Sequence, residues 1–231
     1  YCAGCQHGIV SKLLTELAEE MDIAGNLAVC YGIGCYVAGL MNVDLDMFPA
    51  LHGRGCAVAT GFKRCRPEQL IITYQGDGDL AAIGTAETVH ASTRGENITI
   101  IFINNTTYGM TGGQMAPTTI PEQVTQTTPY GRNVKIQGYP IRMCEMLATL
   151  DGVALAQRVS ADSIPHINDA KRAIRKAFEY QKQKLGLSIV EVLSTCPTNW
   201  GMTPLEAMER IRKECIPYYP LGVYKDIKEE E

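Results

Sequence analysis

Residues 70–79 read LIITYQGDGD, and residues 98–105 read ITIIFINN. Each stretch begins as a short apolar run rich in β-branched residues and ends in polar residues, which is typical of a strand covered on both faces of a parallel sheet. The intervening residues 80–92 (LAAIGTAETVHAS) have a helical composition. These segments predict a strand–helix–strand unit whose right-handed crossover brings the carboxyl ends of both strands side by side.

A second unit of this kind follows. Residues 153–159 and 188–193 are predicted strands, and residues 167–178 are predicted to form a helix between them. That helix would bury one apolar face, made by Ile167, Ala170, Ile174, Ala177 and Phe178. We therefore predict an α/β fold, a mostly parallel sheet covered by helices on both faces, as a single domain spanning residues 1–231. Ligands are expected beyond the carboxyl ends of the strands.

The polar residues after the first two strands predict a magnesium site. Asp77 and Asn105 lie far apart in sequence but would meet at the sheet edge, and Mg²⁺ prefers oxygen ligands. Gly76 and Gly78 would let the chain turn sharply and let a diphosphate approach. The pattern resembles the diphosphate-binding motif of thiamine-diphosphate enzymes, which implies the backbone carbonyl of Thr107 as a third ligand. The alternative is an ordinary Asp-Gly turn.

Two neighbouring segments complete this part of the prediction. Asp79 is expected to be the N-cap of the helix that follows it. Residues 118–140 show neither helical nor strand periodicity, so we predict a long polar loop there, with a role at an interface.

Composition excludes several classes of protein. The 231 residues are 45% hydrophobic, enough for a substantial core, and a net charge of −4 without a basic stripe argues against a nucleic-acid partner. No apolar run approaches the ~20 residues of a membrane span, and no signal peptide is visible, so we expect no membrane association and a cytoplasmic protein. Because the first residue is Tyr1 rather than Met, we expect a trimmed, processed or disordered start.

Nine cysteines favour metal-bound thiolates in a reducing compartment. Cys2 and Cys5 form a C-x-x-C motif, Cys35 follows a Gly-Ile-Gly turn, and Cys196 precedes a proline. Four such thiolates can hold Zn²⁺ or a [4Fe–4S] cluster, and their scatter along the chain argues against a zinc ribbon. Two alternatives remain open. The C-x-x-C pair could have a redox role, and Cys30 could replace Cys35 as the third metal ligand. The other cysteines are predicted to be core residues, namely Cys30, Cys56, Cys65, Cys144 and Cys215.

Several stretches together resemble one family. They are YCAGCQHGIV (1–10), YGIGC (31–35), HGRGCAVATGFKR (52–64), residues 74–119 and CPTNWGMTP (196–204). This combination resembles the thiamine-diphosphate-binding β subunit of 2-oxoacid:ferredoxin oxidoreductases. Tyr1 stands where this family commonly has Trp, and Thr107 stands where an apolar residue is frequent.

The resemblance implies residue roles and cofactors. The [4Fe–4S] ligands would be Cys2, Cys5, Cys35 and Cys196, and the Mg²⁺ ligands Asp77, Asn105 and the carbonyl of Thr107. His52 would be the catalytic residue, moving protons beside the thiazolium. The cofactor would be lined by Gly34, Cys35, His52, Gly76, Asp77, Gly78, Asn105, Thr107, Tyr108, Gly109, Met110 and Thr111.

It also implies a reaction and partners. Thiamine diphosphate would decarboxylate a 2-oxoacid, the cluster would carry electrons to ferredoxin, and coenzyme A would accept the acyl group. An α subunit would supply the pyrimidine-binding half, and γ and ferredoxin-like δ subunits are expected. We expect a branched-chain or aromatic 2-oxoacid, with 2-oxoglutarate as the alternative. That diacid needs a cation for its distal carboxylate, for which Arg54 and Arg132 are the candidates.

Three other functions fit the sequence less well. A non-oxidative thiamine-diphosphate decarboxylase or synthase would leave the four cysteines unexplained. An NAD-dependent dehydrogenase would carry a glycine-rich phosphate loop, whereas Asp77 and Asp79 would repel a dinucleotide phosphate. An iron–sulfur electron carrier would leave Asp77 and Asn105 without a role.

Overall fold

The computed structural model describes residues 1–40 and 42–228. Within them, seven strands form one sheet in the order β2-β1-β3-β4-β6-β5-β7. The strands are β1 (Leu27–Tyr31), β2 (Asp46–Pro49), β3 (Leu70–Gly76), β4 (Thr99–Asn104), β5 (Val153–Ser160), β6 (Leu187–Leu193) and β7 (Gly222–Asp226). All neighbours pair in parallel except β7, which runs antiparallel to β5 at one edge.

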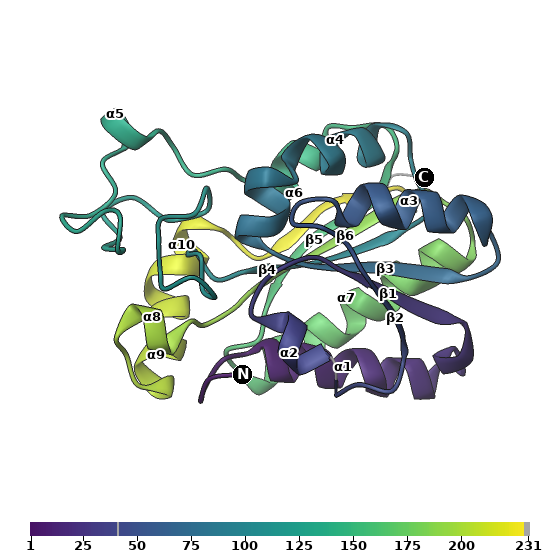
Figure 1. The fold of residues 1–231 in the computed structure, drawn as a ribbon, viewed down its shortest axis with the longest axis horizontal. Coiled ribbons are helices and arrows are strands. Elements are labelled where there is room, and N and C mark those ends of the chain that lie inside the picture. Colours follow the sequence, from purple (N-terminus) through teal and green to yellow (C-terminus); the bar gives the residue numbers. More distant parts are fainter. Residues whose placement is uncertain (41, 229–231) are drawn as a thin grey trace.

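Helices cover both faces of the sheet (Figure 1). One face carries α1 (His7–Glu20), α2 (Tyr36–Leu40) and α7 (Ile164–Lys182), and the other carries α3 (Gly55–Cys65), α4 (Thr85–Thr93) and α6 (Met143–Ala148). A separate hydrophobic core fills the space between each helical layer and the sheet. The predicted α/β class, with a mostly parallel sheet between helices, is therefore confirmed.

The remaining helical segments are short. Near the sheet lie two of them, a 3₁₀ turn (Ala24–Asn26) and a π-helical turn (Asp79–Ile83). Beyond the carboxyl end of the sheet lie α5 (Val134–Gln137), α8 (Pro197–Trp200), α9 (Pro204–Arg210), a π-helical turn (Ile211–Cys215) and α10 (Ile216–Tyr218) (Figure 1). None of the helices in the described part of the chain is both long enough and apolar enough to cross a bilayer.

Both predicted strand–helix–strand units are present, with differences in detail. The crossover between β3 and β4 is divided at Gly84, where the π-helical turn gives way to α4, because the Gly84 backbone packs closely against Gly53. The helix predicted at 167–178 is longer and begins at Ile164, capped by the Ser163 side chain. Strands β1, β2 and β7 were not predicted.

The strand order creates a topological switch point. From β1 the chain goes to β2 on one side, and β3 then pairs with β1 on the other side. In open α/β sheets the loops diverge at such a point and leave a crevice beyond the strand carboxyl ends. The loops after β1 and β3 therefore frame the most favourable position for a ligand.

A buried charge network braces the sheet beneath this edge. Arg158 on β5 is fully buried, and its guanidinium lies 2.5 Å from Glu145 Oε2 and 3.0 Å from Glu191 Oε2. The other Glu191 oxygen accepts a hydrogen bond of 2.8 Å from the Asn104 side chain at the end of β4. Removing the Arg158 guanidinium would leave the buried Glu191 carboxylate without a positive partner, which is strongly destabilising.

Replacing Arg158 with methionine is expected to lower the free energy of unfolding by about 3–5 kcal/mol. The control is Arg142→Ala, because Arg142 is partly exposed and pairs with the same Glu145 at 3.8 Å. That exposed pair should contribute about 1 kcal/mol or less. Urea denaturation of both variants checks the expectation, and equal small losses would contradict it.

Candidate functional site

Three polar groups converge at the ends of β3 and β4. The Asn105 side-chain amide lies 3.2 Å from Asp77 Oδ2 and 2.7 Å from the carbonyl oxygen of Thr107, and with its nitrogen turned toward them it donates a hydrogen bond to each. Turned the other way, the amide would present its oxygen beside these two oxygens, which is a set of ligands that a hard cation prefers. Six oxygens around Mg²⁺ at ~2.1 Å stand about 3 Å from their neighbours, so this donor set fits a magnesium ion.

The backbone at Thr106 is strained to hold this arrangement. Thr106 has a φ of 59°, a left-handed conformation that a β-branched residue rarely adopts. Its carbonyl accepts hydrogen bonds from Thr119 Oγ1 at 2.6 Å and from the Gln123 side chain at 3.0 Å. These contacts hold the turn in which the side chain of Asn105 and the carbonyl of Thr107 face Asp77. Strain of this kind gathers at functional sites.

Asp77 is a buried carboxylate without a positive partner among its contacts. It accepts hydrogen bonds from Thr118 Oγ1 at 2.8 Å, from the Gly78 amide at 2.9 Å and from the Thr107 amide at 3.1 Å. Burial nevertheless raises the pKa of Asp77 to about 7, because hydrogen bonds offset only part of the desolvation. A bound dication would favour the ionised carboxylate.

A cavity of about 250 Å³ lies beside this corner, at the switch point between β1 and β3. Its lining contains eleven of the twelve residues predicted to contact the cofactor, and Thr107 is the exception because it is buried behind the cavity wall. The backbone comes close here: a Cβ at Gly78 would lie 2.1 Å from the Tyr108 ring. The further lining residues are His7, Ile33, Tyr36 and Asp79.

Asp79 has a different role from the predicted helix cap. Its side chain makes no capping bond, so that prediction is wrong. Instead the buried carboxylate accepts hydrogen bonds from the Gly53 amide at 2.6 Å and the Gln75 side chain at 2.7 Å. His52 Nδ1 also lies 2.8 Å from it, which orients the partly exposed imidazole toward the cavity.

The four cysteines selected from the sequence line one cavity of about 410 Å³. Cys2 and Cys5 precede α1, Cys35 follows β1, and Cys196 follows β6. Burial raises the pKa of the Cys35 thiol to about 11, with further increases from Cys196, Cys5 and Cys2. Thiolates here therefore need a positive centre to stabilise them. In the described residues, no three His, Cys, Asp or Glu side chains are placed to hold a single metal ion.

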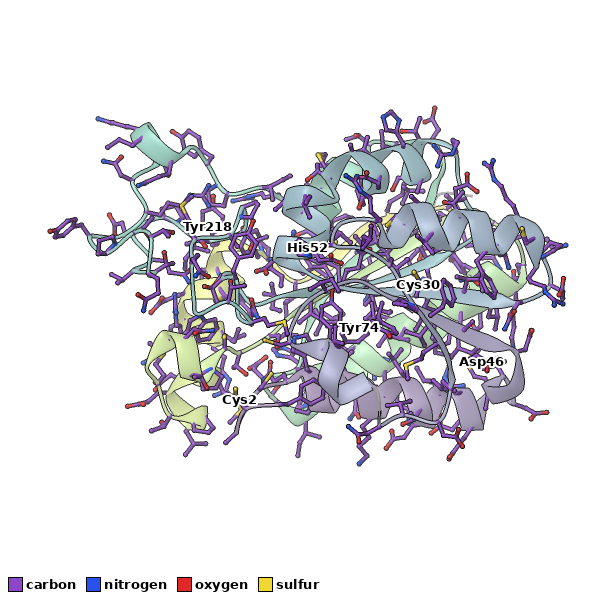
Figure 2. The ribbon with its side chains drawn as sticks, viewed as in Figure 1. Cys2, Cys30, Asp46, His52, Tyr74 and Tyr218 are labelled. Carbon is purple, nitrogen blue, oxygen red and sulfur yellow. The ribbon has the colours of Figure 1, made fainter. Side chains whose placement is uncertain are left out.

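The other cysteines lie elsewhere. Cys30 is fully buried in β1 within the core under α3, well away from Cys2 (Figure 2). Cys56, Cys144 and Cys215 are buried, whereas Cys65 is exposed at the end of α3. The prediction that all five are core residues is therefore wrong for Cys65.

His7 and Asn199 also line these cavities. His7, only 2% exposed, lines both, and burial lowers its pKa to about 4, so the imidazole is neutral. Its Nδ1 lies 3.0 Å from the Tyr74 hydroxyl. Asn199 lines the cysteine cavity only three residues after Cys196. The spacing of Asn199 from Cys196, within one helical turn, is a pattern from which its position could have been predicted. No pattern in the sequence indicates that His7 is buried.

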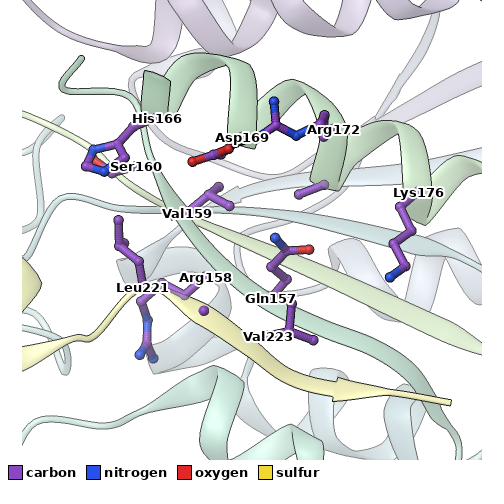
Figure 3. Close-up of a pocket in the computed structure, with 12 residues that line it drawn as sticks. Gln157, Arg158, Val159, Ser160, His166, Asp169, Arg172, Lys176, Leu221 and Val223 are labelled. Carbon is purple, nitrogen blue, oxygen red and sulfur yellow. Dashed lines mark hydrogen bonds and ion pairs between the residues drawn. The ribbon is translucent and has the colours of Figure 1, made fainter. Parts of the chain in front are cut away.

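A cavity of about 460 Å³ between α7 and β7 lacks these features (Figure 3). Its charged side chains are paired, Arg172 with Asp169 and Lys176 with Asp226. Arg54 and Arg132 are likewise engaged: Arg54 pairs with Glu87, and Arg132 donates to backbone carbonyls of the loop at 116–138.

Similarity to known proteins agrees with this geometry. Residues 32–192, which include Asp77, Asn105 and Thr107, match the family described as thiamine pyrophosphate enzyme, C-terminal TPP binding domain. The chain therefore belongs to the thiamine pyrophosphate enzymes, through their TPP-binding domain.

Particular relatives narrow the family. The chain is 43% identical to a ketoisovalerate oxidoreductase subunit VorA of Methanothermobacter thermautotrophicus, over 98% of this chain and 47% of that protein. It is 34% identical to a 2-oxoglutarate synthase subunit KorB of Methanocaldococcus jannaschii, over 100% of this chain and 82% of that protein. It thus spans about half the length of the VorA relative. These similarities confirm the family inferred from the sequence.

A solved structure shows the same fold. The 2-oxoglutarate:ferredoxin oxidoreductase from Magnetococcus marinus, with 2-oxoglutarate, coenzyme A and succinyl-CoA bound, superposes with a TM-score of 0.81. The identity is 27%, and the match covers 98% of this chain and 80% of that one.

Asp77→Ala is expected to weaken Mg²⁺-dependent binding of thiamine diphosphate at least about a hundredfold, about 2.7 kcal/mol, because it removes the only charged oxygen of the corner. Isothermal titration of the assembled protein measures this. Asp151→Ala, which changes an exposed carboxylate, serves as control. Undiminished binding to the Asp77 variant would contradict the assignment.

Proposed function

We propose that this chain is the thiamine-diphosphate-binding β subunit of a 2-oxoacid:ferredoxin oxidoreductase. The reaction would convert a 2-oxoacid and coenzyme A to acyl-CoA and CO₂ while ferredoxin is reduced. The observation that carries the proposal is the shared wall between the two cavities, made by His7, Cys35, Asn105, Gly109 and Met110. A non-oxidative decarboxylase has no need of four cysteines in the adjoining cavity, and an electron carrier has no need of the oxygen corner.

The chain's residues have distinct tasks at the cofactor. Asp77, Asn105 and the Thr107 carbonyl would hold Mg²⁺, which in turn holds the diphosphate. Bound thiamine diphosphate supplies the carbon nucleophile that attacks the 2-oxo group. His52, oriented by Asp79, would move a proton at the reacting carbonyl, since an imidazole can both donate and accept near neutral pH.

Cys2, Cys5, Cys35 and Cys196 would hold the [4Fe–4S] cluster. Its position against the cofactor cavity suits an electron acceptor, because Cys35 lines both cavities. An iron–sulfur site with nine unpaired cysteines also favours a reducing compartment, the cytoplasm.

A partner subunit would complete the thiamine site. The described residues offer one sheet, which provides the diphosphate side, so the pyrimidine side would come from an α subunit. The loop at 118–140 supports this, because its base bonds to Asp77 through Thr118 while its far end exposes large apolar side chains. Those are Val124, Tyr130, Ile136 and Tyr139. Buried Arg132 makes the loop rigid by donating to its carbonyls, as suits a preformed docking surface. Further γ and ferredoxin-like δ subunits belong to the same proposal.

The substrate proposed is a 2-oxoacid with a branched apolar or aromatic side chain. No Lys or Arg lines the cofactor cavity within the described chain, and a distal carboxylate would be left unpaired there. The two arginines considered from the sequence are occupied in other contacts. The alternative, 2-oxoglutarate, would need a cation from the partner subunit.

Cys196→Ser is expected to lower the iron content well below the about four irons of an intact cluster. Iron and sulfide analysis of the anaerobically purified complex measures it, together with the visible absorption band. Cys65→Ser is the matched control, because Cys65 is exposed at the end of α3. Full iron in the Cys196 variant would exclude this cysteine as a ligand.

The substrate proposal predicts the highest kcat/KM for 2-oxoisovalerate or an arylpyruvate. Coenzyme A-dependent reduction of a viologen dye by the complex can be compared across these acids, pyruvate and 2-oxoglutarate. If 2-oxoglutarate is preferred by roughly tenfold, about 1.4 kcal/mol in transition-state free energy, the choice is wrong.

A further inference from the structure

The backbone at Gly109 lies between the two proposed cofactor sites. A Cβ built there would lie 3.3 Å from Cys35 Sγ, 3.6 Å from Cys196 Sγ and 3.4 Å from the Asn105 amide nitrogen. The same short stretch of chain therefore contacts two cysteines of one site and an oxygen-corner residue of the other. A side chain at this position would be in tight contact with Cys35 Sγ.

Asn199 ties that backbone to a cysteine. Its side-chain nitrogen donates to the Gly109 carbonyl at 2.7 Å and also lies 3.3 Å from Cys196 Sγ, within hydrogen-bonding distance. Both bonds use the two protons of one amide, which is held in place because α8 begins directly after Cys196. Asn199 also packs against Gly113, at the other end of the loop that begins at Tyr108.

Each bond has a separate consequence. The bond to Gly109 holds the segment Tyr108–Thr111, which lines the thiamine cavity, against the cysteine cavity. The bond to Cys196 places a donor on a sulfur. A reduced cluster carries one more negative charge than an oxidised one, so a donor to its thiolate stabilises the reduced state more and raises the reduction potential.

We propose that Asn199 is a positioning residue that joins the two sites, holding the thiamine loop through Gly109 and raising the cluster's reduction potential through Cys196. This inference rests on the proposed function, because it requires a cluster on the four cysteines. Through Gly109, the Asn199 amide would set the distance between the electron donor and the electron acceptor. Through Cys196, it would contribute to the difference between their potentials.

The test compares Asn199→Ala with the wild-type complex. Its cluster potential, from an EPR-monitored redox titration, should fall so that the reduction equilibrium weakens by roughly tenfold, 59 mV for one electron. Titration with Mg²⁺ and thiamine diphosphate should give a Kd raised roughly fivefold, the effect of one lost hydrogen bond. Asn26→Ala, which removes an exposed amide in the 3₁₀ turn before β1, should change neither quantity.

The outcomes separate the two proposals. A wild-type complex without iron on this chain would overturn the proposed function itself. An iron-loaded Asn199→Ala protein with wild-type potential and wild-type Kd would overturn the role of Asn199 alone. If the alanine variant loses its iron, the Kd decides, and Asn199→Leu, which is close in size to asparagine but has neither a donor nor a charge, provides the potential. Wild-type values in either measurement then exclude the corresponding bond.

Discussion

The burial of the Asp77 carboxylate beside the Asn105 side chain and the Thr107 carbonyl is the constraint on which the site depends. Asp77 has no positive partner among its contacts, and the Asn105 amide can donate to both neighbouring oxygens. The surrounding structure holds these groups in place: Thr106 adopts a left-handed backbone, and Thr118 and two amides bond to the carboxylate. A buried carboxylate and a strained turn cost stability, and a cation bound at the proposed site would offset that cost.

The support extends into the sheet. Asn104, which precedes the metal corner, donates to Glu191, and Glu191 is compensated by the buried Arg158. The side-chain oxygen of Asn104 also accepts a hydrogen bond from the Thr106 amide. Asn104 therefore belongs both to the corner and to the charge network. Buried polar groups of this kind specify a single geometry because any shift leaves one of them unsatisfied.

The second site repeats the principle with sulfur. Four cysteines from three separate parts of the chain line one cavity, where burial makes the thiolates of Cys5, Cys35 and Cys196 costly. Because the cysteine and oxygen sites follow neighbouring strands of a parallel sheet, both lie against Gly109. The topology would thereby supply the proximity that electron transfer between the proposed cofactors needs.

The sequence by itself determined the mostly parallel sheet and the family, and it supplied the residues of the proposed metal corner. Strongly apolar β-branched runs, the polar residues that follow them and the contexts of the cysteines are local patterns, and they can be seen without coordinates. Strands β1, β2 and β7 were not predicted because each is only four or five residues long. Only the tertiary structure showed that Asp79 contacts His52 rather than a helix end, that Arg132 holds a loop, and that Asn199 bonds to both Gly109 and Cys196. These roles depend on which partners meet across the fold, and a carboxylate, guanidinium or amide has the same local sequence signature whichever partner it finds.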